Sequence, residues 1–111
     1  MVEFQKNVLL INHNIVNTFD FNIRTIIELK GSIIILLEIP FENTIDKNNI
    51  LSVDYDGNII WTLNNADYTK NIYPMEQINL IDDYLCATDF YGRRLKISVD
   101  TGKITEFSIS K

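Results

Sequence analysis

The chain has 111 residues, of which 46% are apolar, and its formal net charge is −5. A chain of this length is expected to form one domain, residues 1–111, with a core of its own. The negative charge argues against binding to nucleic acids or anionic membranes, because both require clustered lysine and arginine. The apolar residues are mainly isoleucine rather than alanine, which favours strands over helices.

Strand-like apolar runs follow one another along the whole chain. In chain order they are residues 8–11, 15–21, 23–29, 32–39, 50–54, 59–63, 78–81, 85–90, 93–99 and 105–109. Short polar turns separate most of these runs, which predicts antiparallel hairpins. Residues 64–74 are polar and are expected to form a long loop. The first twenty residues have the least regular pattern and leave open whether they form strands.

Two of the runs carry more specific predictions. The uninterrupted apolar run Ile33 to Leu37 places bulk on both faces of a strand, so we expect this strand to be central and covered on both sides. Trp61 alternates in phase with Ile59 and Leu63, so we expect all three side chains on a buried face.

Three turn segments resemble one another: SVDYDGNI at residues 52–59, TDFYGRRL at 88–95 and SVDTGKI at 98–104. In the first of them, Asp-Gly between two apolar runs is a strong hairpin signal, because glycine accepts a positive φ. Repeated hairpins of this kind occur in β-propeller blades, but about ten strands are too few to close a propeller. We therefore expect one all-β antiparallel meander, a β-sandwich or half-open barrel of about 8–10 strands.

The sequence contains no arrangement typical of a catalytic, cofactor or metal site. Read as a calcium loop of the helix-loop-helix type starting at Asp54, it has Gly57 at position 4 instead of 6 and Asn65 in place of the terminal glutamate. His13 is the only histidine and lies in a predicted turn, while Cys86 lies in a predicted strand, where a thiol is inert. Phosphate loops, nucleophile elbows and zinc spacings are absent from the sequence. We therefore expect no enzyme activity, no cofactor and no metal.

A cytoplasmic location is expected. A single cysteine cannot form an intrachain disulfide, which fits a reducing compartment. The start of the sequence lacks the pattern of a signal peptide, and the longest apolar run is far too short to span a bilayer.

Aspartates and tyrosines gather at the predicted hairpin turns. Tyrosine is enriched at protein interfaces, and acidic groups attract basic partners. The alternative is that these residues only form polar turns and that the tyrosines cover an edge of the core. We predict a partner-binding surface that consists of Asp54, Tyr55, Asp56, Asp82, Asp83, Asp89 and Tyr91.

From Phe21 onward the chain resembles a family of small bacterial all-β proteins. The resemblance lies in the order of NNILSVDYDGNIIWTL (residues 48–63) and INLIDDYLCATDFYGRRLKISVDTGKI (residues 78–104). Such proteins are similar to the immunity proteins encoded beside bacterial polymorphic or contact-dependent toxins. The resemblance implies a protein that binds and blocks a cognate toxin domain and has no catalytic residues.

The acidic balance of the chain makes a basic toxin domain, for example a nuclease, the expected partner. A second hypothesis is a structural or oligomeric β-module, a partial propeller that completes its sheet with another copy. A third is an enzyme that binds a small molecule.

Overall fold

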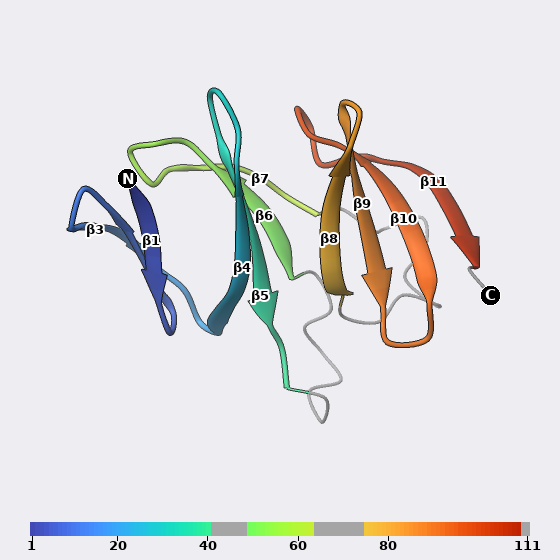
Figure 1. Cartoon of the computed structure of the whole chain (residues 1–111), viewed down its shortest axis with the longest axis horizontal. Helices are drawn as coiled ribbons and strands as arrows, with labels where there is room; N and C mark the ends of the chain where they lie inside the picture. Colours follow the sequence, from blue (N-terminus) through green and yellow to red (C-terminus); the bar gives the residue numbers. More distant parts are fainter. Residues whose placement is uncertain (41–48, 64–74, 110–111) are drawn as a thin grey trace.

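The computed structural model describes residues 1–40, 49–63 and 75–109. In these residues the chain forms eleven strands and no helix. The strands form three antiparallel sheets, and in each sheet neighbours in sequence are neighbours in space (Figure 1). The first sheet consists of β1 (Val2–Gln5), β2 (Val8–Ile11) and β3 (Asn14–Thr18); the second of β4 (Asn22–Glu28), β5 (Ile33–Glu38), β6 (Ile50–Val53) and β7 (Ile59–Thr62); the third of β8 (Met75–Ile81), β9 (Tyr84–Asp89), β10 (Arg93–Ser98) and β11 (Ile104–Ile109).

The prediction of an all-β antiparallel meander is confirmed. Each predicted hairpin in the described residues is present, because a turn rich in glycine or aspartate separates each pair of apolar runs. The N-terminal residues form three strands, of which β1 was not predicted. The loop predicted at residues 64–74 lies outside the described residues.

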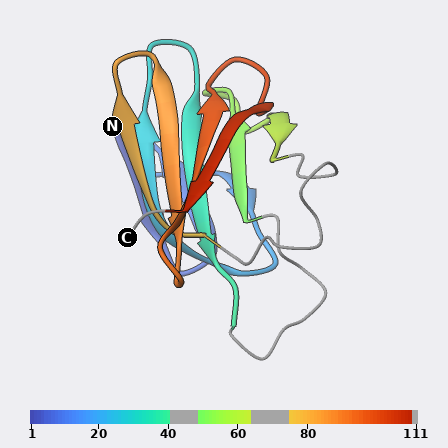
Figure 2. The ribbon, with the colours of Figure 1, turned by 90° about the vertical axis from the view of Figure 1, so that its right-hand side faces the viewer.

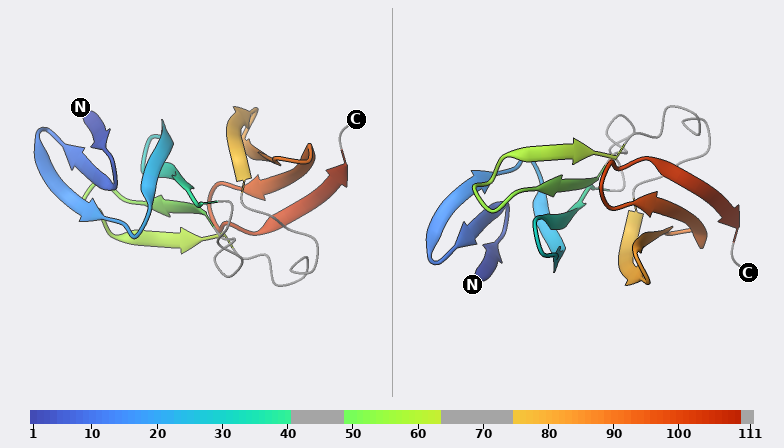
Figure 3. Two further views of the ribbon diagram at one scale, coloured as in Figure 1. Left: turned by 90° about the horizontal axis from the view of Figure 1, so that it is seen from below. Right: turned by 90° about the horizontal axis from the view of Figure 1, so that it is seen from above.

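The three sheets are stacked face to face, with the second sheet in the middle (Figure 3). Side chains alternate along β5, so Ile33 and Ile35 pack with Leu9 between the first and second sheets. Ile34 and Leu36 point the other way, into the core that the second sheet shares with the third. All four side chains are fully buried, which confirms the predicted central strand covered on both sides.

Polar contacts join the second sheet to the third near both ends of their strands. At one end the buried side chain of Asn49 donates to the carbonyl oxygens of Leu37 (2.7 Å) and Met75 (2.8 Å), and its Oδ1 accepts the backbone N–H of Met75 (2.9 Å). At the other end the indole N–H of Trp61 donates to the carbonyl oxygen of Val99 (2.8 Å). The turns of the second and third sheets therefore lie at the same height at the top and at the bottom, as Figure 2 shows from the side of the third sheet.

The prediction for Ile59 is wrong, whereas those for Trp61 and Leu63 are confirmed. Trp61 and Leu63 are buried, but Ile59 is 57% exposed. A β-bulge explains the difference: Val53 pairs with Ile59 and the preceding Ser52 pairs with Trp61, so one extra residue lies between the two pairs on β7. The extra residue reverses the alternation, and Ile59 faces the opposite side of the sheet from Trp61.

Truncation of Ile35 tests the buried middle sheet. Ile35→Ala is expected to lower the free energy of unfolding by about 2–5 kcal/mol, through lost apolar burial and the cavity that remains. Ile59→Ala is the matched control, because that side chain is mostly exposed, and it should change stability by less than about 0.5 kcal/mol. Equal losses for the two variants in chemical denaturation would contradict the assignment of the faces.

Candidate protein-binding surface

The seven residues predicted to bind a partner lie in three hairpin turns, which the structure places at two opposite edges. The β6–β7 turn carries Asp54, Tyr55 and Asp56, and the β8–β9 turn carries Asp82 and Asp83. Both turns lie at the upper edge in Figure 1. Asp89, the last residue of β9, and Tyr91 in the β9–β10 turn lie at the lower edge, because β9 runs from one edge of its sheet to the other.

Two of these aspartates, Asp54 and Asp89, each hold a turn together. Oδ1 of Asp54 accepts the backbone N–H groups two and four residues later, both at 2.9 Å. Oδ1 of Asp89 accepts the corresponding two N–H groups at the same distances. Glycine follows each aspartate by three residues with a positive φ, 89° at Gly57 and 80° at Gly92. The repeated sequence pattern therefore encodes one turn, used twice.

Asp89 is not available to a partner, so the prediction that it adds charge to a binding surface is wrong. The residue is 4% exposed, and its Oδ2 accepts the Nε–H of Arg93 at 2.8 Å in a shielded ion pair. Among the residues that the structure describes, no cation pairs with Asp54, and its Oδ2 lies 3.4 Å from the Nδ2 of Asn58. The backbone N–H of Asn58 holds the pKa of Asp54 below its ordinary 3.8, because that hydrogen bond favours the ionised carboxylate.

Tyr55 presents a fixed aromatic ring at the upper edge. Its hydroxyl donates to the carbonyl oxygen of Leu29 at 2.6 Å, which ties the β6–β7 turn to the β4–β5 turn. Tyr84, the first residue of β9, is also exposed, and the Nζ of Lys96 lies 4.1 Å from the centre of its ring. Tyr84 was not among the predicted residues, although its position directly after Asp83 was a usable signal.

We define the acidic rim as the four turns at the upper edge of the second and third sheets: residues 29–32, 54–58, 82–83 and 99–103. Its charged residues are Asp54, Asp56, Asp82, Asp83, Asp100, Lys30 and Lys103. Five aspartates against two lysines give the rim a negative charge. In the β6–β7 turn, hydrogen bonds hold Asp54 and Tyr55 in place before a partner binds.

Tyr91 belongs to a different surface with different chemistry. Its ring packs edge-on against Phe90, with the ring centroids 5.5 Å apart, and the guanidinium of Arg93 lies 5.8 Å from the Tyr91 centroid. Arg94 follows directly in the chain. The lower end of the third sheet is therefore aromatic, its Arg93 is already paired with Asp89, and it does not extend the acidic rim.

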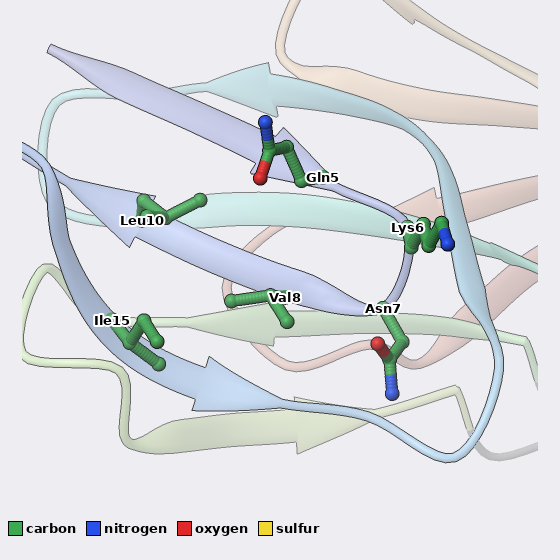
Figure 4. A pocket seen from close by; sticks show the side chains of 6 residues that line it. All are labelled: Gln5, Lys6, Asn7, Val8, Leu10 and Ile15. Atoms are coloured by element: carbon green, nitrogen blue, oxygen red, sulfur yellow. The ribbon is translucent and has the colours of Figure 1, made fainter.

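The outer face of the first sheet contains a shallow hollow of about 530 Å³ (Figure 4). Val8, Leu10 and Ile15 form its apolar part, and the polar residues around it are Gln5, Lys6 and Asn7. Lys6 is the one ionisable side chain in this lining, so the hollow does not pair an acid with a base. Within the described residues, no three histidine, cysteine or carboxylate side chains are grouped as a metal site requires.

A comparison with protein families gives a match over nearly the whole chain. The model of a family described as a domain of unknown function (DUF7957) matches residues 1–109. No protein with a curated description matches the sequence. Over the part of the chain that the structure describes, there is no helix long and apolar enough to cross a membrane.

The role of Asp54 in its turn predicts a pH dependence of stability. Because the pKa of Asp54 is lowered on folding, its carboxylate stabilises the protein above the unfolded pKa, and this contribution is lost as the pH falls through the folded pKa. Asp54→Asn should therefore be less stable than the parent at pH 7, and the difference should shrink to zero between about pH 5 and pH 2. Denaturant unfolding at several pH values measures it, with Asp83→Asn in an exposed turn as the control. A difference that persists at the lowest pH would show that the charge is not involved.

Gly57 and Gly31 form a matched pair for the turn geometry. A Cβ added to Gly57 would overlap the carbonyl oxygen of Val16, and its φ is positive, whereas a Cβ on Gly31 meets no atom within 4 Å. Gly57→Ala should lower stability by roughly 2–4 kcal/mol, and Gly31→Ala by less than about 0.5 kcal/mol. Thermal or denaturant melts that place the two variants together would refute the packing of this turn against β3.

Proposed function

We propose that this chain, which belongs to the DUF7957 family, is a protein-binding domain that acts as an immunity protein. In this role it binds the basic surface of a cognate toxin domain, for example a nuclease, and blocks it inside the cytoplasm. The observation that carries the proposal is the acidic rim: turns from two sheets present aspartates along one edge, together with a tyrosine whose hydroxyl is held by a hydrogen bond. The resemblance to immunity proteins supports the same role.

The charge of the rim suits such a partner. A nuclease is basic where it holds phosphate, so a row of carboxylates competes for the same surface. Exposed carboxylates at Asp56, Asp82 and Asp83 chiefly accelerate association, since they are solvated and contribute little energy one by one.

Tyr55 is the anchor in this arrangement. Its ring is partly exposed, and the hydroxyl bond to Leu29 holds it in place before binding. A preordered aromatic side chain loses little conformational entropy when a partner covers it, so it slows dissociation.

Binding kinetics with the toxin domain encoded beside this chain test the two roles. Replacing Asp56, Asp82 and Asp83 together by asparagine should slow association at low salt by about tenfold and flatten its salt dependence. The control replaces Glu3, Glu38 and Glu106 by glutamine, which removes the same charge away from the rim. Tyr55→Ala should raise the dissociation rate, while Tyr55→Phe keeps the ring and should raise it less.

Co-expression decides the class of function. Cells that produce the toxin domain should survive only with a soluble copy of this chain. If cells die equally with and without it, the immunity role is lost. If protection and the binding rates are unchanged by every rim variant, another face of the molecule binds the toxin.

A second candidate function is structural. The three stacked meanders resemble successive blades, and the outer faces of the first and third sheets are uncovered by described residues. A stable oligomer in light scattering, unaffected by the rim variants, would favour this role.

A further inference from the structure

The first sheet is one strand shorter than the sheet it packs against. β1 lies against β4, the first strand of the second sheet. β3 lies against the β6–β7 turn, where the Nδ2 of Asn17 donates to the carbonyl oxygen of Gly57 at 2.8 Å. The strands of the two sheets thus correspond in order, and β7 has no counterpart among the described strands of the first sheet. Figure 4 shows β7, in yellow-green, beyond the free edge of β3.

The missing strand leaves apolar side chains exposed on β7. Ile59 is 57% exposed and Ile60 is 49% exposed. Ile59 pairs with Val53, and paired residues point to the same face of a sheet. Val53 is buried in the core between the first and second sheets. A fourth strand in the first sheet would therefore extend that core over Ile59.

The free edge of β3 has few of the features that protect an edge strand. Edge strands are usually protected by lysine, proline or another covering element. β3 reads Asn-Ile-Val-Asn-Thr and β7 reads Ile-Ile-Trp-Thr, with no charge and no proline in either. Oδ1 of Asn17 accepts the N–H of Thr18 at 2.7 Å, which occupies one end of the edge. The carbonyl oxygen of Val16 is packed against Gly57, so Asn14 and Ile15 are the part of the edge that remains able to pair.

We propose that an extended segment of a partner protein adds to the free edge of β3 and covers Ile59 and Ile60. This addition makes the first sheet four-stranded, with main-chain hydrogen bonds for affinity and alternate apolar side chains for fit. Aspartates flank the position, Asp56 in the β6–β7 turn and Asp20 after β3. The segment therefore has apolar residues at alternate positions and a lysine or arginine near each end.

A second copy of this chain does not fit the same position. Each copy carries a net charge of −5, so two copies repel one another, whereas a segment with basic ends is attracted to this position. The inference is independent of the proposed immunity role, because it needs a partner of this chemistry and not a toxin.

A synthetic peptide with the sequence of residues 103–111, KITEFSISK, is a suitable probe. β11 is the fourth strand of its own sheet, and the peptide has a lysine at each end. Titration of the ¹⁵N-labelled full chain should shift the amide signals of Asn14–Val16 and Ile59–Thr62. A peptide with glutamate at both ends should bind more weakly, and a scrambled peptide should leave these signals unchanged.

Two variants provide the matched comparison. Ile59→Lys should weaken peptide binding by about tenfold or more, because it places a charge where an apolar side chain must pack. Ile81→Lys, at an equally exposed position (55%) on β8, should leave the affinity unchanged. Replacing Asp82 and Asp83 by asparagine should also leave it unchanged, so this inference and the rim proposal can fail separately.

Four results would overturn the inference. One is the absence of shifts at millimolar peptide, and a second is shifts confined to the hollow on the outer face of the first sheet or to the edge of β8. A third is equal weakening by Ile59→Lys and Ile81→Lys. The fourth is a concentration-dependent dimer in light scattering that Ile59→Lys abolishes, since a second copy would then cover β7.

Discussion

The buried amide of Asn49 is the contact on which the relation between the second and third sheets depends. It acts as an additional peptide group. Its Nδ2 donates to the carbonyl oxygens of Leu37 near the end of β5 and of Met75 at the start of β8, and its Oδ1 accepts the N–H of Met75. Each of these buried backbone groups would cost roughly 1–3 kcal/mol if left unpaired. The amide therefore sets where β8 starts beside β5, and the turns of both sheets reach the same edge. The acidic rim exists because of this alignment.

The middle sheet explains why function is placed at turns and edges. Both of its faces are covered by the neighbouring sheets, because Ile34 and Ile35 are buried in different cores. Outer faces, strand edges and hairpin turns are the surfaces that remain for a partner. The rim and the uncovered β7 adjoin one another at the β6–β7 turn, which contributes Tyr55 to one and Asp56 to both. One turn therefore connects two surfaces of different chemistry.

Asp54 and Asp89 show how one local role leads to two different surface properties. Each organises the same turn through Oδ1, so both are required by the fold first. What differs is the second oxygen: at Asp89 it is held by the guanidinium of Arg93, and at Asp54 it lies near the amide of Asn58. The residue four positions along the turn thus decides whether the carboxylate charge is neutralised or remains at the surface.

The sequence by itself determined the class of fold, the hairpins and the buried character of β5, because apolar alternation and turn residues act over a few neighbouring positions. Only the tertiary structure decided that Ile59 is exposed, since that depends on a bulge and on a sheet that ends one strand early. It also separated Asp89 and Tyr91 from the other candidate residues, because the direction of β9 carries its two turns to opposite edges. Local pattern fixes which residues form a turn, whereas the stacking of sheets decides which turns a partner can meet together.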